Sequence, residues 1–360
     1  MTIGIDISPA CRKQKTGIEW YAWHIARGLL AKATGDTQFR LYSDVSVDEE
    51  LRNANTCVLR WPTKYFWPET RLTAEMIVRP PDLLFVPSRA LPLVLPKKTV
   101  TTIHDVGFIP FPDERKALSR AYLLATSRRA AQRADHIITV SQFAKDEIVK
   151  YFHIPSEKIT VTHLGYDKAR YVPGSGKTAK PYILCVGRRE RRKNLIRLVA
   201  AYELLREQMK DDAPDLVIVG PAGHHASEID RAIANSPARD SIRVRDWVSE
   251  EEKIALLQNA ACLVQPSLYE GFGLPVIEAQ ACGTPVACSN TASLPEIAGS
   301  GALYFDPLSP VDIAENVFRL ITNTDTRKDI REKGLKNAQR FDWDTTAEQT
   351  LEVLHTALRG

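Results

Sequence analysis

The chain reads Glu270-Gly271-Phe272-Gly273-Leu274-Pro275-Val276-Ile277-Glu278-Ala279 at the point that decides the fold. Pro275 suits the first turn of a helix, where a missing N–H costs nothing, and the two glycines before it allow a sharp backbone turn. Free amides at such a helix start form an anion site. With a pyrophosphate there, Glu270 and Glu278 can accept paired hydrogen bonds from the hydroxyls at the two ends of a nucleoside diphosphate sugar. The stretch therefore indicates a sugar-nucleotide site.

The plainer interpretation is that two acids eight residues apart belong to a solvated surface. These two, however, lie in an apolar run that continues to Ala281-Cys282-Gly283-Thr284-Pro285-Val286. Unpaired carboxylates in such surroundings would be costly. We therefore assign Glu270 and Glu278 to a binding site.

The composition is that of a folded chain with more than one core. The 360 residues are 44% hydrophobic and 26% charged, which is enough for two domains. A net charge of +4 is too small to indicate a nucleic-acid partner. No apolar run approaches the roughly 18 residues of a membrane span, and the chain opens like a first strand and not like a signal peptide. We expect a cytoplasmic protein in which most of the six cysteines are small buried hydrophobes.

Short β-branched runs alternate with longer amphipathic stretches, which is the pattern of an α/β protein with doubly wound parallel sheets. Strand candidates in the first half are residues 3–7, 39–42, 83–86, 99–103, 136–140 and 159–162. Those in the second half are residues 182–186, 216–219, 242–244, 262–265, 285–287 and 302–304. Two sets of six predict two sheets. The boundary is expected at Tyr171-Val172-Pro173-Gly174-Ser175-Gly176-Lys177-Thr178, a stretch without apolar periodicity.

Segment 270–279 resembles the Glu-x7-Glu signature of family 4 of the retaining glycosyltransferases (glycosyl transferases group 1), and the likeness is strongest to mannosyltransferases. The resemblance covers nearly the full length. It implies the B-type (GT-B) fold, in which two Rossmann-like domains face each other across a cleft. The expected parts are an acceptor-binding domain over residues 1–170, a nucleotide-sugar domain over 171–344, and a terminal helix over 345–360 that crosses back to the first domain.

The same resemblance implies roles for individual residues. Glu270 would contact the donor sugar and Glu278 the nucleotide ribose, with Phe272, Gly273 and Leu274 between them in the donor site. Gly17, at a helix start, would bring its backbone against a phosphate, although a glycine needed only for the turn would look the same. His104, at a strand end, would hydrogen-bond the sugar near the reacting centre. Val248 would line the nucleotide pocket.

A second cluster reads Arg188-Arg189-Glu190-Arg191-Arg192-Lys193-Asn194 and leads into a helix. Five cations in six residues oppose the helix dipole, which favours anions at a helix start, so the cluster predicts an anionic partner. The resemblance implies that Arg188 and Lys193 bind the donor pyrophosphate, with Arg192 as an alternative to Arg188. A solvated basic turn balanced by Glu190 is the competing interpretation.

The sequence gives no reason to expect a metal or another cofactor. His224 and His225 lack a third ligand. Asp211 and Asp212 precede a strand, whereas the metal-holding Asp-x-Asp of the other glycosyltransferase fold follows one. We expect metal-independent catalysis in which His104, Arg188, Lys193 and Glu270 are the catalytic residues.

Two stretches are candidates for an acceptor or membrane surface. One reads Trp61-Pro62-Thr63-Lys64-Tyr65-Phe66-Trp67-Pro68, with Arg60 and Arg71 nearby. The other, residues 115–133, carries basic and apolar side chains as on an amphipathic surface helix. Aromatic residues more often fill a core, but we favour peripheral contact with an anionic membrane.

Taken together, the residues and the resemblance predict a retaining hexosyltransferase. It would move a hexose, with mannose from GDP-mannose as the first choice, from a nucleoside diphosphate sugar to a hydroxyl of a glycan or lipid-linked glycan in bacterial polysaccharide or glycolipid synthesis. One alternative is a non-catalytic glycan-binding or scaffold protein on the same fold. Another is a sugar nucleotide epimerase or phosphorylase of the B-type fold. No nucleic-acid recognition module is recognisable.

Overall fold

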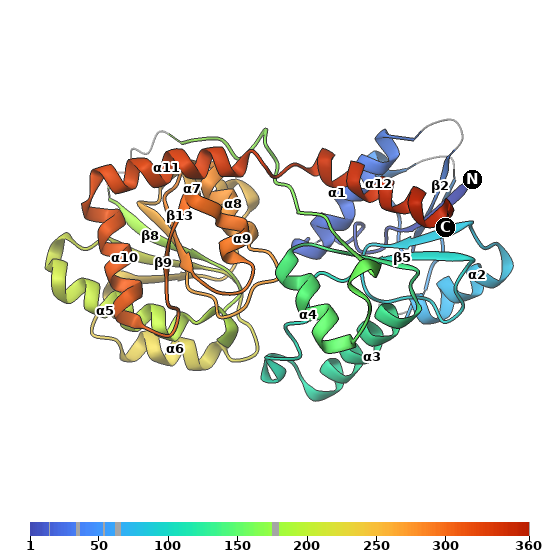
Figure 1. The fold of residues 1–360 in the computed structure, drawn as a ribbon. Coiled ribbons are helices and arrows are strands. Elements are labelled where there is room, and N and C mark those ends of the chain that lie inside the picture. The colour runs from blue at the N-terminus through green and yellow to red at the C-terminus, as the bar shows by residue number, and fades with distance from the viewer. Residues whose placement is uncertain (14, 34–36, 53–54, 62–65, 175–179, 360) are drawn as a thin grey trace. The chain divides into compact units, whose positions relative to one another are not determined.

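The computed structural model describes residues 1–13, 15–33, 37–52, 55–61, 66–174 and 180–359. The chain forms two compact units. The first contains Met1–Val106, Leu118–Gly165 and Trp343–Gly360, and the second contains Gly107–Ala117 and Tyr166–Asp342. Each unit is built on its own parallel sheet (Figure 1).

The first sheet has the strand order β3-β2-β1-β4-β5-β6-β7. Its strands are β1 (Thr2–Asp6), β2 (Gln38–Ser43), β3 (Thr56–Val58), β4 (Leu83–Val86), β5 (Lys98–Thr102), β6 (His136–Thr139) and β7 (Ile159–Val161). The expected count of six was wrong, because β3 was missed. This edge strand of three residues pairs with β2 at Leu41, Tyr42 and Ser43, and so short a run has too few alternations to be recognised in a sequence.

The second sheet has the six strands expected, in the order β10-β9-β8-β11-β12-β13. They are β8 (Tyr182–Val186), β9 (Asp215–Val219), β10 (Ile242–Arg245), β11 (Cys262–Gln265), β12 (Val286–Ser289) and β13 (Ala302–Phe305). The winding reverses between β8 and β11. Both units are therefore Rossmann-like and doubly wound, as the sequence predicted.

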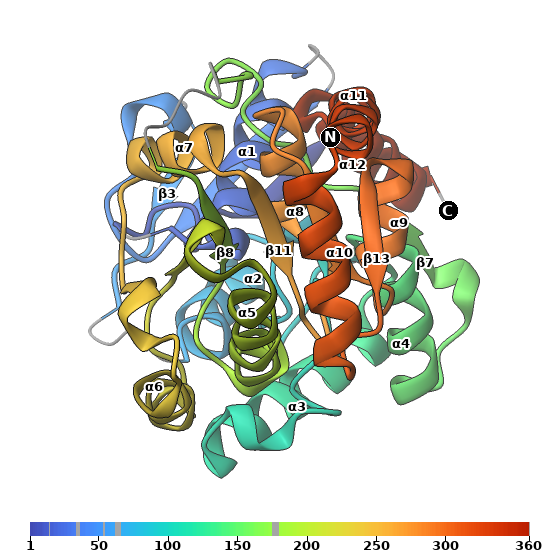
Figure 2. The same ribbon diagram turned by 90° about the vertical axis from the view of Figure 1, so that its left-hand side faces the viewer.

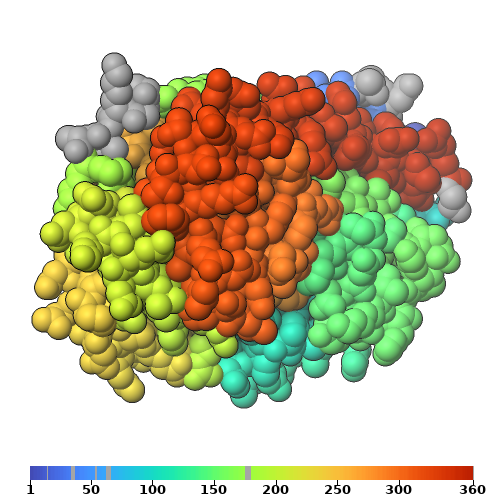
Figure 3. All heavy atoms as spheres, turned by 60° about the vertical axis from the view of Figure 1, so that its left-hand side comes forward, coloured from blue at the N-terminus to red at the C-terminus, as the bar shows by residue number. Residues whose placement is uncertain are grey.

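Helices cover both faces of the second sheet. They are α5 (Leu195–Met209), α6 (Ala226–Asn235), α7 (Glu250–Asn259), α8 (Leu274–Ala281), α9 (Leu294–Ala298), α10 (Pro310–Thr322) and α11 (Thr324–Ala338). Helices α5, α6 and α10 share one apolar core with the sheet, whereas α7, α8 and α9 share another. Figure 2 shows α5 and α10 side by side over the strands. In Figure 3 the orange and red atoms of residues 310–338 form much of the visible face of this unit.

The first unit has the helices α1 (Gly17–Ala31), α2 (Thr73–Val78), α3 (Ala117–Arg133), α4 (Gln142–Phe152) and α12 (Trp343–Arg359). The terminal helix α12 belongs to this unit and packs on α1. The Trp343 ring stacks on His24 with centroids 4.5 Å apart, and Thr346 donates a hydrogen bond to the carbonyl oxygen of His163. Buried Ala347 thus packs α12 on α1, and buried Thr346 ties it to His163.

The units differ from the expected domains at three places. The division falls between Gly165 and Tyr166 instead of after residue 170, and the terminal helix starts at Trp343 instead of residue 345. Segment Gly107–Ala117 joins the second unit, although it lies within the first half of the sequence. Residues 175–178 of the expected linker lie outside the described part of the chain, as do residues 62–65 of the aromatic stretch.

Gly28 of α1 lies directly against Ala347 of α12. A Cβ added at Gly28 would lie 2.5 Å from the Cβ of Ala347. We predict that Gly28→Ala lowers the free energy of unfolding by about 1–3 kcal/mol through overpacking, even though alanine favours helix over glycine by about 1 kcal/mol. Urea unfolding followed by circular dichroism measures the change.

The double variant Gly28→Ala/Ala347→Gly removes the clashing methyl group and should recover most of the loss. A Gly28→Ala protein as stable as the parent would contradict the close packing of α12 on α1.

Candidate active site

Two loops of the second unit meet at the point where its sheet reverses its winding. One, residues 187–193, follows β8, and the other, residues 266–273, follows β11. Open α/β sheets bind their ligands beyond the carboxyl ends of the strands at such a switch point. The backbone N–H of Leu268 donates to the carbonyl oxygen of Arg192 at 2.8 Å. The two loops are therefore tied to each other by their backbones.

Glu270 is held through one of its two oxygens. Its Oε1 accepts hydrogen bonds from Lys193 Nζ at 2.5 Å, Ser267 Oγ at 2.8 Å and Gln265 Nε2 at 2.9 Å. Its Oε2 lies 3.6 Å from the Arg192 guanidinium and makes no hydrogen bond with any described residue. Glu270 therefore has a fixed orientation and one oxygen available to accept a hydrogen bond.

Burial alone would raise the pKa of Glu270, but the charges of Lys193 and Arg192, with hydrogen bonds from Lys193 and Ser267, lower it to about 2. The folded pKa thus lies below the ordinary value of 4.5. The stabilisation from ionised Glu270 is complete above pH 4.5 and is lost as the pH falls towards 2. At neutral pH the side chain is a carboxylate, which accepts hydrogen bonds and donates none.

Glu278, on α8, repeats the arrangement. Its Oε1 lies 2.9 Å from Lys253 Nζ and 3.2 Å from the Tyr171 hydroxyl. Its Oε2 has no hydrogen-bond partner within the described ranges. Burial would lower the pKa of Lys253, but the carboxylates of Glu278 and Glu250 raise it. A charged lysine therefore pairs with each glutamate of the motif.

The start of α8 between these two acids requires glycine. Gly273 has φ +117°, and a Cβ added there would lie 2.9 Å from Leu294 Cδ2. No side chain caps the first turn. Pro275 has no N–H, and the N–H of Val276 donates to the Gly273 carbonyl oxygen, so the N–H of Leu274 is the first-turn amide available to an anion. Ser293 Oγ lies 2.9 Å and 2.6 Å from the carbonyl oxygens of Glu270 and Phe272 and fixes the loop. The Phe272 ring is buried against Phe341, whereas Leu274 is partly exposed.

The basic turn after β8 is mostly paired within the protein. Arg189 bonds Asp246 and the Gly220 carbonyl oxygen, Arg191 bonds Glu228, Arg192 bonds Glu190, and Lys193 bonds Glu270. Arg188 lies farther from its nearest described carboxylate than the other four cations lie from theirs. Its side chain is 46% exposed, and its closest described carboxylate is Glu190 at 3.5 Å. Much of the anionic partner that the sequence predicted is therefore protein carboxylate, and Arg188 is the cation best placed to meet a ligand.

The first unit holds the two other predicted residues. His104 is buried after β5, where its Nε2 lies 3.2 Å from the Pro87 carbonyl oxygen and its ring meets the edge of Tyr21. Burial lowers the pKa of His104 to about 4. The imidazole is thus neutral at pH 7, donates from Nε2 to the carbonyl, and keeps Nδ1 as an acceptor. Gly17 starts α1 one turn before Tyr21, behind a capping box of Thr16 and Glu19.

The second unit brings together Arg188, Lys193, Glu270, Phe272, Gly273, Leu274 and Glu278, with Val248 partly buried ahead of α7. Sequence reasoning missed Gln265 and Ser267, although polar residues that end an apolar strand just before Glu270 were a usable signal. It also missed Lys253 and Tyr171. Their contacts with Glu278 depend on tertiary packing and leave no local pattern.

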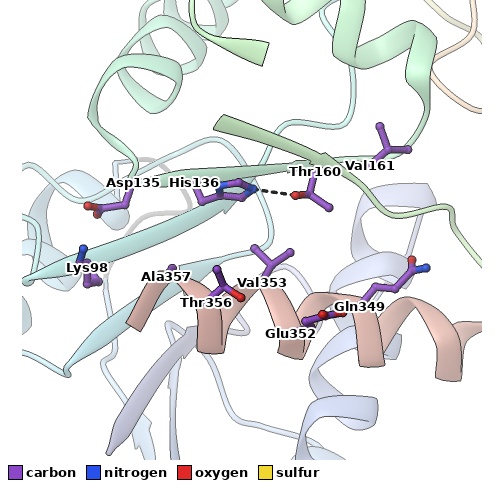
Figure 4. Close-up of a pocket in the computed structure, with 10 residues that line it drawn as sticks. All are labelled: Lys98, Asp135, His136, Thr160, Val161, Gln349, Glu352, Val353, Thr356 and Ala357. Carbon is purple, nitrogen blue, oxygen red and sulfur yellow. Dashed lines mark hydrogen bonds between the residues drawn. The ribbon is translucent and has the colours of Figure 1, made fainter. Parts of the chain in front are cut away.

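Other candidate sites hold none of the predicted residues. Among the described residues, no group of three or more His, Cys, Asp or Glu side chains could hold a metal ion. His225 already contacts Asp113 and Glu228 through its two ring nitrogens. The first unit has an open groove of about 650 Å³ between α12 and strands β6 and β7, where His136 points at Thr160 above Val353 (Figure 4).

Comparison with known proteins agrees with this geometry. The family model described as Glycosyl transferases group 1 matches residues 167–337, and the model described as Glycosyltransferase Family 4 matches residues 15–170. O-antigen chain mannosyltransferase B of Escherichia coli is 31% identical over 268 residues, which are 71% of this chain and 70% of that protein. O-antigen chain mannosyltransferase RfbU of Salmonella typhimurium is 28% identical over 307 residues, 84% of this chain and 82% of that protein.

Among solved structures, sucrose-phosphate synthase from Thermosynechococcus elongatus superposes with a TM-score of 0.79 at 18% identity, over 99% of this chain and 98% of that one. Its likeness shows the GT-B fold. The chain belongs to the glycosyltransferases of group 1 and family 4, as its Glu270–Glu278 motif predicted.

The neutral state of His104 can be tested directly. We predict that its ring nitrogens titrate with a midpoint of about 4 in long-range ¹H–¹⁵N spectra of protein labelled at histidine. Because the folded pKa lies below that of the unfolded chain, His104 removes stability as the pH falls from 6.5 towards 4. His104→Gln identifies the resonances by their loss. A midpoint near 6.5 would contradict the burial of the ring.

Proposed function

We propose that this glycosyltransferase is a retaining enzyme that moves a hexose from a nucleoside diphosphate sugar to a hydroxyl of a glycan or lipid-linked glycan. The observation that carries the proposal is the matched pair Glu270 and Glu278, each with one oxygen bound to a lysine and the other without a hydrogen bond to any described residue. Two carboxylates held in this way suit the sugar and ribose diols at the two ends of one donor. Mannose from GDP-mannose is our first choice, because the relatives are named mannosyltransferases.

The same names favour a role in bacterial polysaccharide or glycolipid synthesis. As the anomeric bond breaks, negative charge grows on the leaving diphosphate. Arg188, Lys193 and the amides at the start of α8 are the groups that would stabilise it. These groups can do so without a metal ion. In our proposal the acceptor attacks from the face that the diphosphate leaves, and the diphosphate takes its proton, so no side-chain base is needed.

Arg188 provides the clearest test, because it is exposed and because its buried partner Glu190 keeps an ion pair with Arg192 when Arg188 is lost. A charge-assisted hydrogen bond contributes about 1.5–3 kcal/mol. We therefore expect Arg188→Gln to lower the transfer rate about ten- to a hundred-fold with an unchanged melting temperature. The assay mixes GDP-mannose with acceptor glycan, measures nucleotide release and product together, and assigns the product anomer by NMR.

The control is Arg239→Gln, which removes another exposed arginine of the same unit and should leave the rate unchanged. The wild-type protein is first screened by thermal shift against GDP, UDP, ADP and dTDP sugars, since a ligand that binds the folded state raises the melting temperature. Absence of any response, or full activity of Arg188→Gln, would count against the donor site. Donor conversion without an acceptor would indicate an epimerase.

Peripheral membrane contact also belongs to the proposal. No helix within the described ranges is long and apolar enough to cross a membrane. Leu118 and Tyr122 lie one turn apart on α3 with exposed fractions of 84% and 36%, and Tyr122 contacts the exposed ring of Phe66. Exposed Arg120 and Arg128 lie on the same helix. Exposed apolar side chains with nearby cations suit an anionic lipid surface.

We predict that the protein floats with vesicles that contain phosphatidylglycerol and not with vesicles of phosphatidylcholine alone. Leu118→Glu/Arg120→Glu should abolish flotation and leave the melting temperature unchanged, because both side chains are solvated. Binding of neither vesicle by the wild type would exclude this part of the proposal.

A further inference from the structure

Segment Gly107–Ala117, which we call the strap, leaves the first unit after Val106 and returns to it at Leu118. Between these points it belongs to the second unit. It starts two residues after Asp105, the neighbour of His104. No motif in the sequence singled it out for the donor site.

The strap supplies a cap that the basic turn lacks. Residues Arg191–Lys193 form a short 3-10 turn, and Glu190 at its start makes no side-chain cap. The backbone N–H of Arg192 instead donates to Glu114 Oε1 at 2.8 Å. The contact joins residues 78 apart in sequence. A carboxylate at this position accepts a hydrogen bond from a backbone amide of the turn, and it offsets the positive charges clustered there.

Glu114 is built into the unit and is not a surface acid. It is only 7% exposed, and its Oε2 has no hydrogen-bond partner among the described residues. Burying a carboxylate is costly unless its charge is compensated. The charge of Arg191, at the capped turn, attracts the Glu114 carboxylate. The hydrogen bond from Arg192 N–H also offsets part of the cost of burying Glu114.

The strap contacts both loops of the candidate site and the loop after β9. Besides the turn after β8, the Phe111 ring meets Tyr269, the residue before Glu270, with centroids 5.9 Å apart. The carbonyl oxygen of Asp113 lies 2.8 Å from His225 Nε2 in the loop after β9. The Arg192 side chain donates to the Tyr269 carbonyl oxygen at 3.3 Å. A shift of Arg192 would therefore move the neighbouring Lys193 and, through it, Glu270.

We propose that Glu114 is a positioning residue, which caps the basic turn through Arg192 N–H and so holds Lys193 and Glu270 in the geometry that binds the donor. The donor part of this inference rests on the proposed function. The capping part concerns only the order of the turn and can be tested without any ligand.

The experiment compares three full-length variants with the wild type. Glu114→Ala removes the acceptor. Glu114→Gln keeps an oxygen that can accept from Arg192 N–H and removes the charge. Asp113→Ala removes the neighbouring side chain, which is 74% exposed and lies 3.8 Å from Arg191. This variant keeps the backbone carbonyl oxygen that His225 contacts. Each variant is measured by hydrogen–deuterium exchange over residues 188–194 and by titration with GDP.

We expect Glu114→Ala to raise amide exchange over residues 188–194 about tenfold, with the exchange of α5 unchanged, and to raise the Kd for GDP about tenfold. Glu114→Gln should restore both quantities to within about threefold of the wild type, and Asp113→Ala should change neither. A rescue by glutamine distinguishes a hydrogen-bonded cap from general loosening of the unit.

Wild-type exchange in Glu114→Ala would overturn the proposal, as would a Glu114→Gln protein as impaired as Glu114→Ala. If Glu114→Ala does not fold, Glu114→Asp, whose carboxylate is one methylene shorter, replaces it in both measurements. If the wild type binds no nucleotide, the proposed function fails, and the exchange data alone then decide whether Glu114 caps the turn.

Discussion

The buried ion pair between Lys193 and Glu270 is the interaction on which the second unit depends. The two side chains are 11% and 9% exposed and meet at 2.5 Å. Desolvating two charges costs several kcal/mol for each ion, and their attraction repays this only with good geometry and further hydrogen bonds. Ser267 and Gln265 supply those bonds. The pair joins the loop after β8 to the loop after β11. The conformation of each loop therefore depends on that of the other.

A second charged pair, Lys253 with Glu278, has the same form on the other side of the α8 start. In each case the lysine contacts only Oε1. Protein groups thus determine how each carboxylate lies while leaving it an oxygen for another partner. Such preorganisation avoids the cost of ordering the side chains when a ligand binds. The burial of Glu270 and Glu278 therefore fixes the geometry of the candidate site as well as contributing to the packing of the unit.

The strands and the turn into α8 could be predicted from the sequence, because each depends on residues that are adjacent in the chain. The strands show as β-branched runs, and the turn into α8 shows as glycines followed by Pro275. The partners of the glutamates are harder to predict. Lys193 was named as a phosphate ligand, yet its bond to Glu270 depends on the order in which β8 and β11 pair. The same holds for Tyr171, which was expected in a linker and instead contacts Glu278.

The division of the chain into two discontinuous units limits how homologous proteins of this kind can recombine. The chain passes between the units after Val106, Ala117, Gly165 and Asp342. Recombination at a single crossover near Gly165 would therefore not transfer a whole unit. The recipient would gain the basic turn of residues 188–193 but would keep its own strap, with whatever residue it has in place of Glu114. The second unit is therefore discontinuous in sequence, and two segments from one parent are needed to transfer it whole.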